Sequence, residues 1–107
     1  MDELAADSRA QLTVTADDGE LRVALRGELD IASLPSVEPE LDRLLSREPQ
    51  PVQVDATDLA FLDSSGLVVL VRVANHFAPV QLRGARPAVR RVIEALGLAD
   101  RLGLERS

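Results

Sequence analysis

A polar tip lies between two apolar runs of the chain, and it consists of Asp63, Ser64, Ser65 and Gly66. Asp and Ser are preferred where a helix begins, because their side-chain oxygens accept hydrogen bonds from backbone N–H groups that have no intrahelical partner. A helix capped by Asp63 would place the Ser64 hydroxyl on the surface, at the positive end of the helix dipole. That hydroxyl could act as a nucleophile, bind a ligand or accept a phosphate, whereas the simplest interpretation of the four residues alone is an ordinary helix start.

An enzyme that used Ser64 as its nucleophile would need a base within hydrogen-bond reach. His76 is the only histidine, and along one helix it would lie about 18 Å from Ser64. The surrounding residues also differ from the Gly-x-Ser-x-Gly elbow of hydrolases. We therefore expect no catalytic residues and no enzymatic activity. Gly66, which has no side chain, would let another backbone or a partner molecule approach closely.

The composition limits the other chemistry that the chain can support. Its 107 residues suffice for one small domain with a modest core, and Phe61 and Phe77 are the only aromatic residues. The sequence has no cysteine and only one histidine, so we expect no disulfide, no metal site and no other cofactor. The net charge of −6 argues against nucleic acid as a partner, because clustered Lys and Arg drive binding to phosphate backbones.

The beginning of the chain is polar and acidic without any periodicity, and we expect a disordered arm at residues 1–10 before a single domain at 11–107. This start lacks the basic residues and the apolar run of a signal peptide. The longest apolar run of the sequence is far shorter than the roughly 20 residues that a membrane helix needs. These features predict a cytoplasmic protein that does not insert directly into a membrane.

The elements that must hold the polar tip begin with a hairpin. Apolar and polar residues alternate over 12–16 and again over 21–25, and Asp17-Asp18-Gly19-Glu20 forms the turn between them. The period then becomes that of a helix over 33–46, where the apolar positions form one stripe. A short buried strand at 52–55 and a loop lead from there to the polar tip.

The run from Leu67 to Ala74 is almost entirely aliphatic, so periodicity alone cannot separate a buried strand from a buried helix. The helix-start residues before it favour a helix over 64–77. A strand at 79–83, a helix at 87–96 and a final short strand within 98–104 complete the order. A hairpin followed by alternating helices and strands predicts an α/β fold, with a mixed sheet of four or five strands and three main helices.

Loops that follow parallel strands emerge at one edge of a sheet, where ligands and partners usually bind. The loops after the second, third and fourth predicted strands should share that edge, which would bring Asp30, Ser64 and Arg86 together. For Arg86, Arg90 and Arg91 the simpler expectation is a solvated helix face.

Three segments of the sequence resemble the STAS domain family, and more closely the free-standing bacterial anti-sigma-factor antagonists within it. The matching segments are Gly27-Glu-Leu-Asp30, Asp58-Leu-Ala-Phe-Leu-Asp-Ser-Ser-Gly-Leu67 and Pro87-Ala-Val-Arg-Arg91. The central segment is the specific one, and the order and spacing of all three extend the resemblance from about Leu12 to Leu104. The resemblance implies a STAS-like fold in which the aliphatic run is a helix.

In this family the first serine of Asp-Ser-Ser-Gly accepts a phosphate, and Ser64 occupies that position. The resemblance implies that the unphosphorylated protein binds an anti-sigma factor that is also a serine kinase, and thereby frees the sigma factor. Phosphorylation of Ser64 by that kinase would end the interaction, and a separate serine phosphatase would restore it. The residues expected to contact the partner are Asp30, Asp63, Ser65, Gly66 and Leu67.

A different task for the same fold is an accessory subunit that docks on the ATPase of a membrane transporter. Such a subunit could bind the ATPase through the same edge, at the helix that begins with the polar tip, without any phosphorylation. Many family members have Gly-Leu-Gly where this chain has Gly66, Leu67 and Val68. A nucleotide could also bind this fold, although the sequence has no glycine-rich loop of the kind that cradles phosphates.

Overall fold

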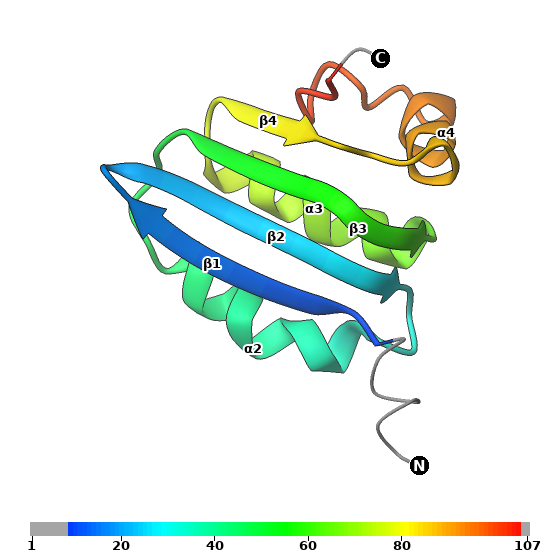
Figure 1. The fold of residues 1–107 in the computed structure, drawn as a ribbon, viewed down its shortest axis with the longest axis horizontal. Helices are drawn as coiled ribbons and strands as arrows, with labels where there is room; N and C mark the ends of the chain where they lie inside the picture. Colours follow the sequence, from blue (N-terminus) through cyan, green and yellow to red (C-terminus); the bar gives the residue numbers. More distant parts are fainter. Residues whose placement is uncertain (1–8, 106–107) are drawn as a thin grey trace.

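A computed structural model describes residues 9–105 as one mixed sheet with helices packed against it (Figure 1). The strands, in the order β1-β2-β3-β4 across the sheet, are β1 (Gln11–Asp17), β2 (Glu20–Leu29), β3 (Val52–Leu62) and β4 (Val80–Arg83). β1 pairs antiparallel with β2, and the other two neighbouring pairs are parallel. The predicted opening hairpin is confirmed, and Asp18 and Gly19 form its two-residue turn with φ angles of 52° and 80°.

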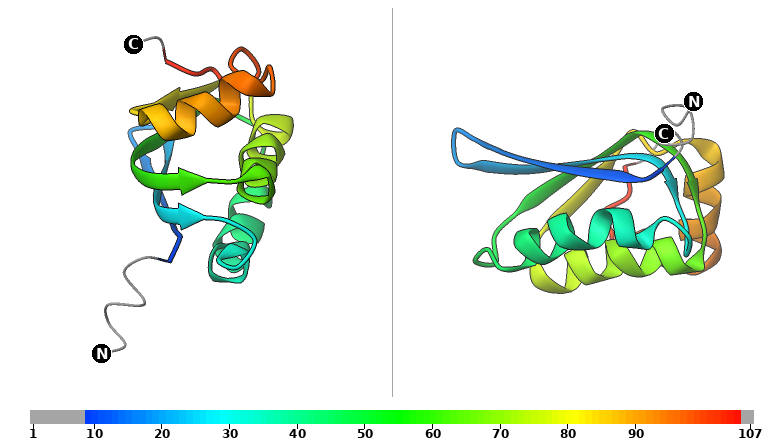
Figure 2. Two further views of the ribbon diagram at one scale, coloured as in Figure 1. Left: turned by 90° about the vertical axis from the view of Figure 1, so that its right-hand side faces the viewer. Right: turned by 90° about the horizontal axis from the view of Figure 1, so that it is seen from below.

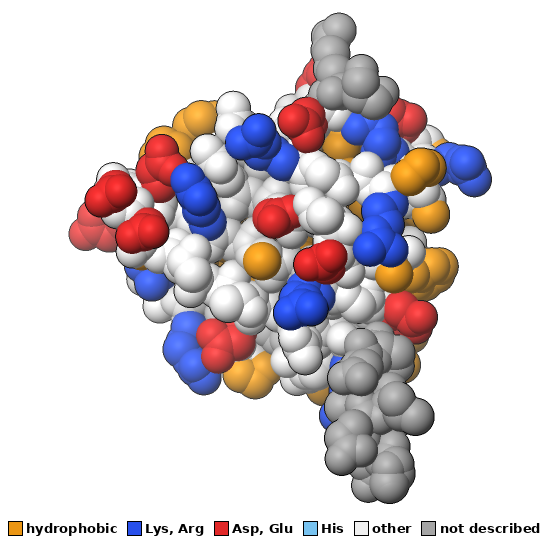
Figure 3. Space-filling view, viewed as in Figure 1, with side chains coloured by type: hydrophobic (Ala, Val, Ile, Leu, Met, Phe, Trp, Pro, Cys, Tyr) orange, Lys and Arg blue, Asp and Glu red, His pale blue; other side chains and the backbone are white. Residues whose placement is uncertain are grey.

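The helices are α2 (Leu34–Leu45), α3 (Ser64–His76) and α4 (Pro87–Ala95). α2 and α3 lie side by side on one face of the sheet, and α4 lies beyond the end of β4 (Figure 2). The α/β fold with a mixed sheet and three main helices is therefore confirmed, and so is the helix predicted over the aliphatic run. Within residues 9–105 the opposite face of the sheet carries no helix, and it presents charged side chains of both signs (Figure 3).

The core between the sheet and the helices is aliphatic apart from Phe77, which is fully buried. α3 contributes Leu67, Leu70 and Val73 to this core, and each is less than 5% exposed. Burial of such side chains is the main force that fixes α3 against the sheet. The N-terminal end of α3, and with it the polar tip, is consequently held in a fixed position.

β3 is longer than the strand predicted at 52–55, because it continues to Leu62 and takes the place of the predicted loop. Its buried positions are two residues apart up to Ala56 and then three apart, at Leu59 and Leu62. The register against β2 shifts at both of the wider steps, so β3 carries one extra residue each time. These two bulges interrupt the period of two by which a strand is recognised in a sequence.

The folded domain begins earlier than predicted. Residues 1–8 of the predicted arm lie outside the described residues. Arg9, however, forms a parallel bridge with Glu28, and Ala10 is buried in the core. Both residues therefore belong to the domain.

The predicted final strand within 98–104 is mostly turns, and a single parallel bridge joins Leu104 to Leu82. The Leu82 N–H donates to the Gly103 carbonyl, and the Leu82 carbonyl accepts from the Glu105 N–H, both at 2.9 Å. Arg90 donates to the Glu105 carbonyl and is only partly exposed, so the expected fully solvated arginine is wrong at this position. Residues 103–105 thus close the outer edge of β4.

Candidate functional site

Ser64 is the first residue of α3, and only Asp63 separates it from the end of β3. Its side chain is exposed, because the buried face of α3 begins only with Gly66 and Leu67. Asp63 occupies the N-cap position with extended backbone, and its Oδ1 accepts the Gly66 N–H at 2.8 Å. The Ser64 hydroxyl therefore lies on the surface at a helix N-terminus, as the sequence predicts.

Asp63 also connects this helix start to the loop after β2. Its Oδ2 accepts the Ile31 N–H at 3.3 Å, and its own N–H donates to the Leu29 carbonyl at 3.3 Å. The polar tip and the β2–α2 loop are therefore held together as one surface. Sequence alone indicated the cap but not this second bond.

Replacing Asp63 with alanine is expected to lower the free energy of unfolding by about 1 kcal/mol, because an N-cap bond is lost. Asp63→Asn is the matched control, since an amide oxygen can still cap the helix while the charge is removed. Chemical denaturation of the two variants and the wild type measures the difference. A D63A variant as stable as the wild type would show that the cap contributes nothing.

Gly66 allows the start of α3 to approach the end of β2. A Cβ atom built on Gly66 would overlap the Leu29 carbonyl oxygen and lie 2.9 Å from both the carbonyl carbon and Cγ of that leucine. The close approach expected at Gly66 is thus made by another part of this chain. Leu67 is also buried, with 4% of its surface exposed. Within the predicted contact set, Gly66 and Leu67 therefore pack inside the domain, while Ser65 and Asp63 are partly exposed.

Asp30 lies in the β2–α2 loop and is partly exposed. Its Oδ1 accepts the Ser33 N–H and its own N–H donates to Ser33 Oγ, both at 3.0 Å. Ser33 Oγ donates in turn to the Glu28 carbonyl at 2.7 Å. These reciprocal bonds fix the loop, so Asp30 orients the residue that follows it, Ile31.

Two exposed apolar side chains flank the polar tip, and sequence reasoning missed both. Ile31 is 70% exposed, and its backbone is bonded to Asp63. Val68 is 54% exposed and lies four residues after Ser64, on the same side of α3. The sequence held one indication for Val68. It is an apolar residue at a position where many family members have glycine, but it stands in an aliphatic run that resembles a buried core segment. We call Ile31, Ser64 and Val68 the switch surface.

Arg86 is the N-cap residue of α4, and its side chain extends over the open face of the sheet. Its Nε donates to the Thr57 carbonyl at 2.9 Å, and it lines a hollow of about 610 Å³ with Arg26 and Asp58. Asp30 and Ser64 are brought together through Asp63, but the contacts of Arg86 are with β3. The sequence predicted that three loops would meet. The structure joins the loop after β2 to the start of α3, whereas the loop before α4 contacts β3 instead.

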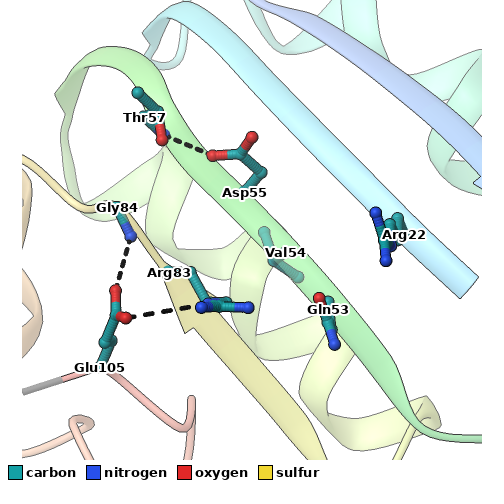
Figure 4. Close-up of a pocket in the computed structure, with 8 residues that line it drawn as sticks. All are labelled: Arg22, Gln53, Val54, Asp55, Thr57, Arg83, Gly84 and Glu105. Atoms are coloured by element: carbon teal, nitrogen blue, oxygen red, sulfur yellow. Dashed lines mark hydrogen bonds and ion pairs between the residues drawn. The ribbon is translucent and has the colours of Figure 1, made fainter.

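A second hollow, of about 390 Å³, lies on the same open face (Figure 4). Within it Arg83 Nε lies 3.8 Å from Oε2 of Glu105, and Oε1 of the same carboxylate accepts the Gly84 N–H at 3.1 Å. Hydrogen bonds from Thr57 lower the pKa of Asp55, so this carboxylate stays ionised under ordinary conditions. The charged groups that line the hollow are thus largely engaged by neighbours within the chain.

Across residues 9–105 no group of three His, Asp or Glu side chains is arranged to hold a metal ion. No helix within the same residues combines the length and the apolar character needed to cross a bilayer.

Comparison with models of protein families matches residues 12–105 to the family described as "Mlab, STAS domain". Comparison with curated protein sequences finds no match. Among solved structures, the chain is similar to an anti-sigma factor antagonist from Mycobacterium paratuberculosis, with a TM-score of 0.77 and 26% identity over 94% of this chain and 88% of that one.

Two more distant structures share the fold. The anti-sigma factor antagonist SpoIIAA in its unphosphorylated form has a TM-score of 0.60 and 22% identity, over 92% of this chain and 89% of its own. An uncharacterized protein from the DUF3478 family of Shewanella loihica PV-4, with a SpoIIAA-like fold, has a TM-score of 0.57 and 14% identity, over 91% of this chain and 84% of its own.

Proposed function

The chain belongs to the STAS domain family, and from that premise we propose that it is an anti-sigma-factor antagonist in a partner-switching circuit. Its unphosphorylated form binds an anti-sigma factor that is also a serine kinase, and this binding releases the sigma factor. The kinase then phosphorylates Ser64, which ends the interaction, and a serine phosphatase reverses the change. The circuit operates in the cytoplasm, without nucleic acid or membrane insertion by this chain. The similarity to the mycobacterial antagonist supports this proposal.

The observation that carries the proposal is the position of Ser64. Its hydroxyl is exposed at the first position of α3, and Asp63 and Gly66 hold that helix start against β2. Ile31 and Val68 give the surrounding surface an apolar character that suits a protein partner. A kinase can therefore reach the hydroxyl, and the phosphate then lies in the middle of the contact.

The charge of a phosphate explains how the contact would be broken. Phosphorylation adds about −1.5 to −2 charges, on a chain whose net charge is already −6. The added group also needs water around it, which an apolar contact at Ile31 and Val68 would exclude. The helix N-terminus stabilises an anion in the free protein, so the phosphorylated protein remains folded.

Ser64 is expected to be the main site of phosphorylation when the protein is incubated with ATP and its cognate kinase. Mass spectrometry should locate the phosphate on Ser64, and Ser64→Ala should abolish it. Ser65→Ala is the matched control and should still be labelled at Ser64, because Ser65 is partly buried and the cap by Asp63 is retained. Labelling that maps to Ser65 would contradict the proposed switch.

The same geometry favours a binding protein over an enzyme. His76 is the last residue of α3 and its Nε2 lies 2.6 Å from the Arg47 carbonyl oxygen, so it is at the opposite end of the helix from Ser64. The Asp63 carboxylate is engaged by two backbone N–H groups. Neither group is placed to remove a proton from the Ser64 hydroxyl, and we propose no enzymatic activity for the chain.

A second candidate function is an accessory subunit that docks on the ATPase of a membrane transporter. The exposed apolar side chains of Ile31 and Val68 favour it, because an apolar contact needs no phosphorylation. The two functions differ in their dependence on Ser64. A docking subunit should acquire no phosphate from a kinase and should bind its ATPase equally well with Ser64→Ala.

A further inference from the structure

β1 forms one outer edge of the sheet, and among residues 9–105 no other strand pairs with its outer side. The strand is seven residues long and pairs with β2 without any register shift. In the right-hand view of Figure 2 neither a helix nor a strand crosses in front of it. A regular edge of this length is a template for pairing with another strand.

The register identifies the backbone groups that face outward. Asp17 and Glu20 close the two-residue turn, so they form a hydrogen-bonded pair, and such pairs alternate along an antiparallel ladder. Thr15 and Thr13 therefore also bond toward β2. The N–H and carbonyl groups of the intervening residues point away from the sheet, and these residues are Leu12, Val14 and Ala16.

β1 lacks the devices that usually protect an edge. Its sequence, Gln-Leu-Thr-Val-Thr-Ala-Asp, has no proline, no lysine and no bulge. Its only charge is at the end, on Asp17. The other edge of the sheet, at β4, is closed by the bonds from residues 103–105. The contrast singles out β1 as the edge that is ready to pair.

We propose that two copies of this chain pair through β1, antiparallel and centred on Val14. In this arrangement Val14 bonds to its own counterpart, and Leu12 bonds to Ala16 of the second copy in both directions. Each outward N–H and carbonyl group then has a partner. On the open face, Thr13 lies opposite Thr15 of the second copy, a pairing that stabilises antiparallel sheets.

The charges at the two ends of β1 match this orientation. Arg9 precedes the strand and is exposed, whereas Asp17, Asp18 and Glu20 gather at the hairpin turn. The turn forms the acidic end of the sheet in Figure 3. Antiparallel pairing places each Arg9 near the acidic turn of the second copy. A parallel arrangement would instead place the two acidic turns together.

The pairing leaves the switch surface free. Ser64 follows the end of β3, at the ends of the strands rather than along the β1 edge. The dimer would thus present two separate copies of the switch surface.

Cysteine cross-linking tests the register, because the natural sequence contains no cysteine. In the proposed dimer Val14→Cys faces its own counterpart, at a Cα separation of about 5.5 Å that a disulfide can span. Gln11→Cys is the matched control in the same strand, because its two copies would lie about 20 Å apart. Under mild oxidation V14C should give at least about tenfold more disulfide-linked dimer than Q11C. Equal cross-linking of the two variants would overturn the proposed register.

A proline substitution tests the edge itself. The Ala16 N–H points outward, so Ala16→Pro should leave the β1–β2 ladder and the melting temperature nearly unchanged. It removes two bonds from each dimer, and we expect the dimer Kd from sedimentation equilibrium to rise about tenfold or more. Ala16→Ser keeps the N–H and should dimerise like the wild type. A wild-type chain that stays monomeric at about 1 mM, or a folded A16P variant that dimerises unchanged, would overturn the proposal.

Discussion

Gly66→Ala is expected to lower the free energy of unfolding by about 3 kcal/mol, although alanine is the better helix former. Gly66 lies inside α3 with ordinary helical backbone, and helix propensity alone would make alanine more stable by about 0.5–1 kcal/mol. The added methyl group, however, would overlap the Leu29 carbonyl oxygen. Because that neighbour is backbone at the end of β2, α3 and the sheet must separate to relieve the overlap. The steric cost is the larger of the two effects.

Thermal and chemical denaturation measure this difference, and a loss of about 3 kcal/mol corresponds to a melting temperature lower by about 10 °C or more for a domain of this size. Gly97→Ala is the matched control. A Cβ atom on Gly97 meets nothing within 4 Å, so this variant incurs only the strain of a positive φ, which is 71° at that position. A G66A variant as stable as the wild type would mean that the start of α3 is not held against β2.

Ser64→Glu is expected to weaken binding to the anti-sigma factor by about tenfold or more, with little change in melting temperature. The carboxylate introduces a charge between Ile31 and Val68, where a partner would have to remove its water. Fold stability is retained, because an anion near a helix N-terminus is stabilised by about 0.3–1 kcal/mol. The effect of true phosphorylation should be larger, since a phosphate carries more charge than one carboxylate.

Isothermal titration calorimetry with the purified anti-sigma factor measures the loss of affinity. Ser64→Gln is the matched control, because glutamine has the size of glutamate without its charge, and its Kd should stay within about threefold of the wild type. Ser64→Ala should likewise bind normally. If Ser64→Glu binds as tightly as the wild type, charge at this position does not control the interaction.

The sequence was sufficient to predict the order of the elements from β1 to α4 and the position of the polar tip. The hairpin followed from alternation around an Asp-Gly turn, and the capped serine followed from the residue types at 63–66. The aliphatic run at 67–74 became a helix only through the cap before it and the family resemblance. Periodicity could not decide there, because almost every position in the run is apolar.

Features that depend on contacts between distant segments could not be predicted in the same way. A bulge in β3 is defined by its pairing with β2, and the sequence of β3 alone does not contain that pairing. In the sequence the two extra residues only interrupt the alternation of apolar and polar positions. Gly66 was expected to permit a close approach, but only the structure identifies Leu29 as the group that approaches. Exposure of Val68 and Ile31 likewise depends on which neighbours cover them, and this information is absent from residue type.

The segment that closes the β4 edge has a consequence for how large an assembly can become. Gly103 is suited to this position, since it has a φ of 59° and a Cβ atom there would overlap the Val80 carbonyl oxygen. With β4 closed, residues 9–105 offer one unpaired sheet edge, at β1, so each molecule resembles a monofunctional monomer in a polymerisation. When two molecules pair through this edge, neither has a second edge left for another copy, so growth stops at the dimer. Opening the 103–105 segment would make the molecule bifunctional, and sheet addition could then propagate into fibres instead of ending at a pair.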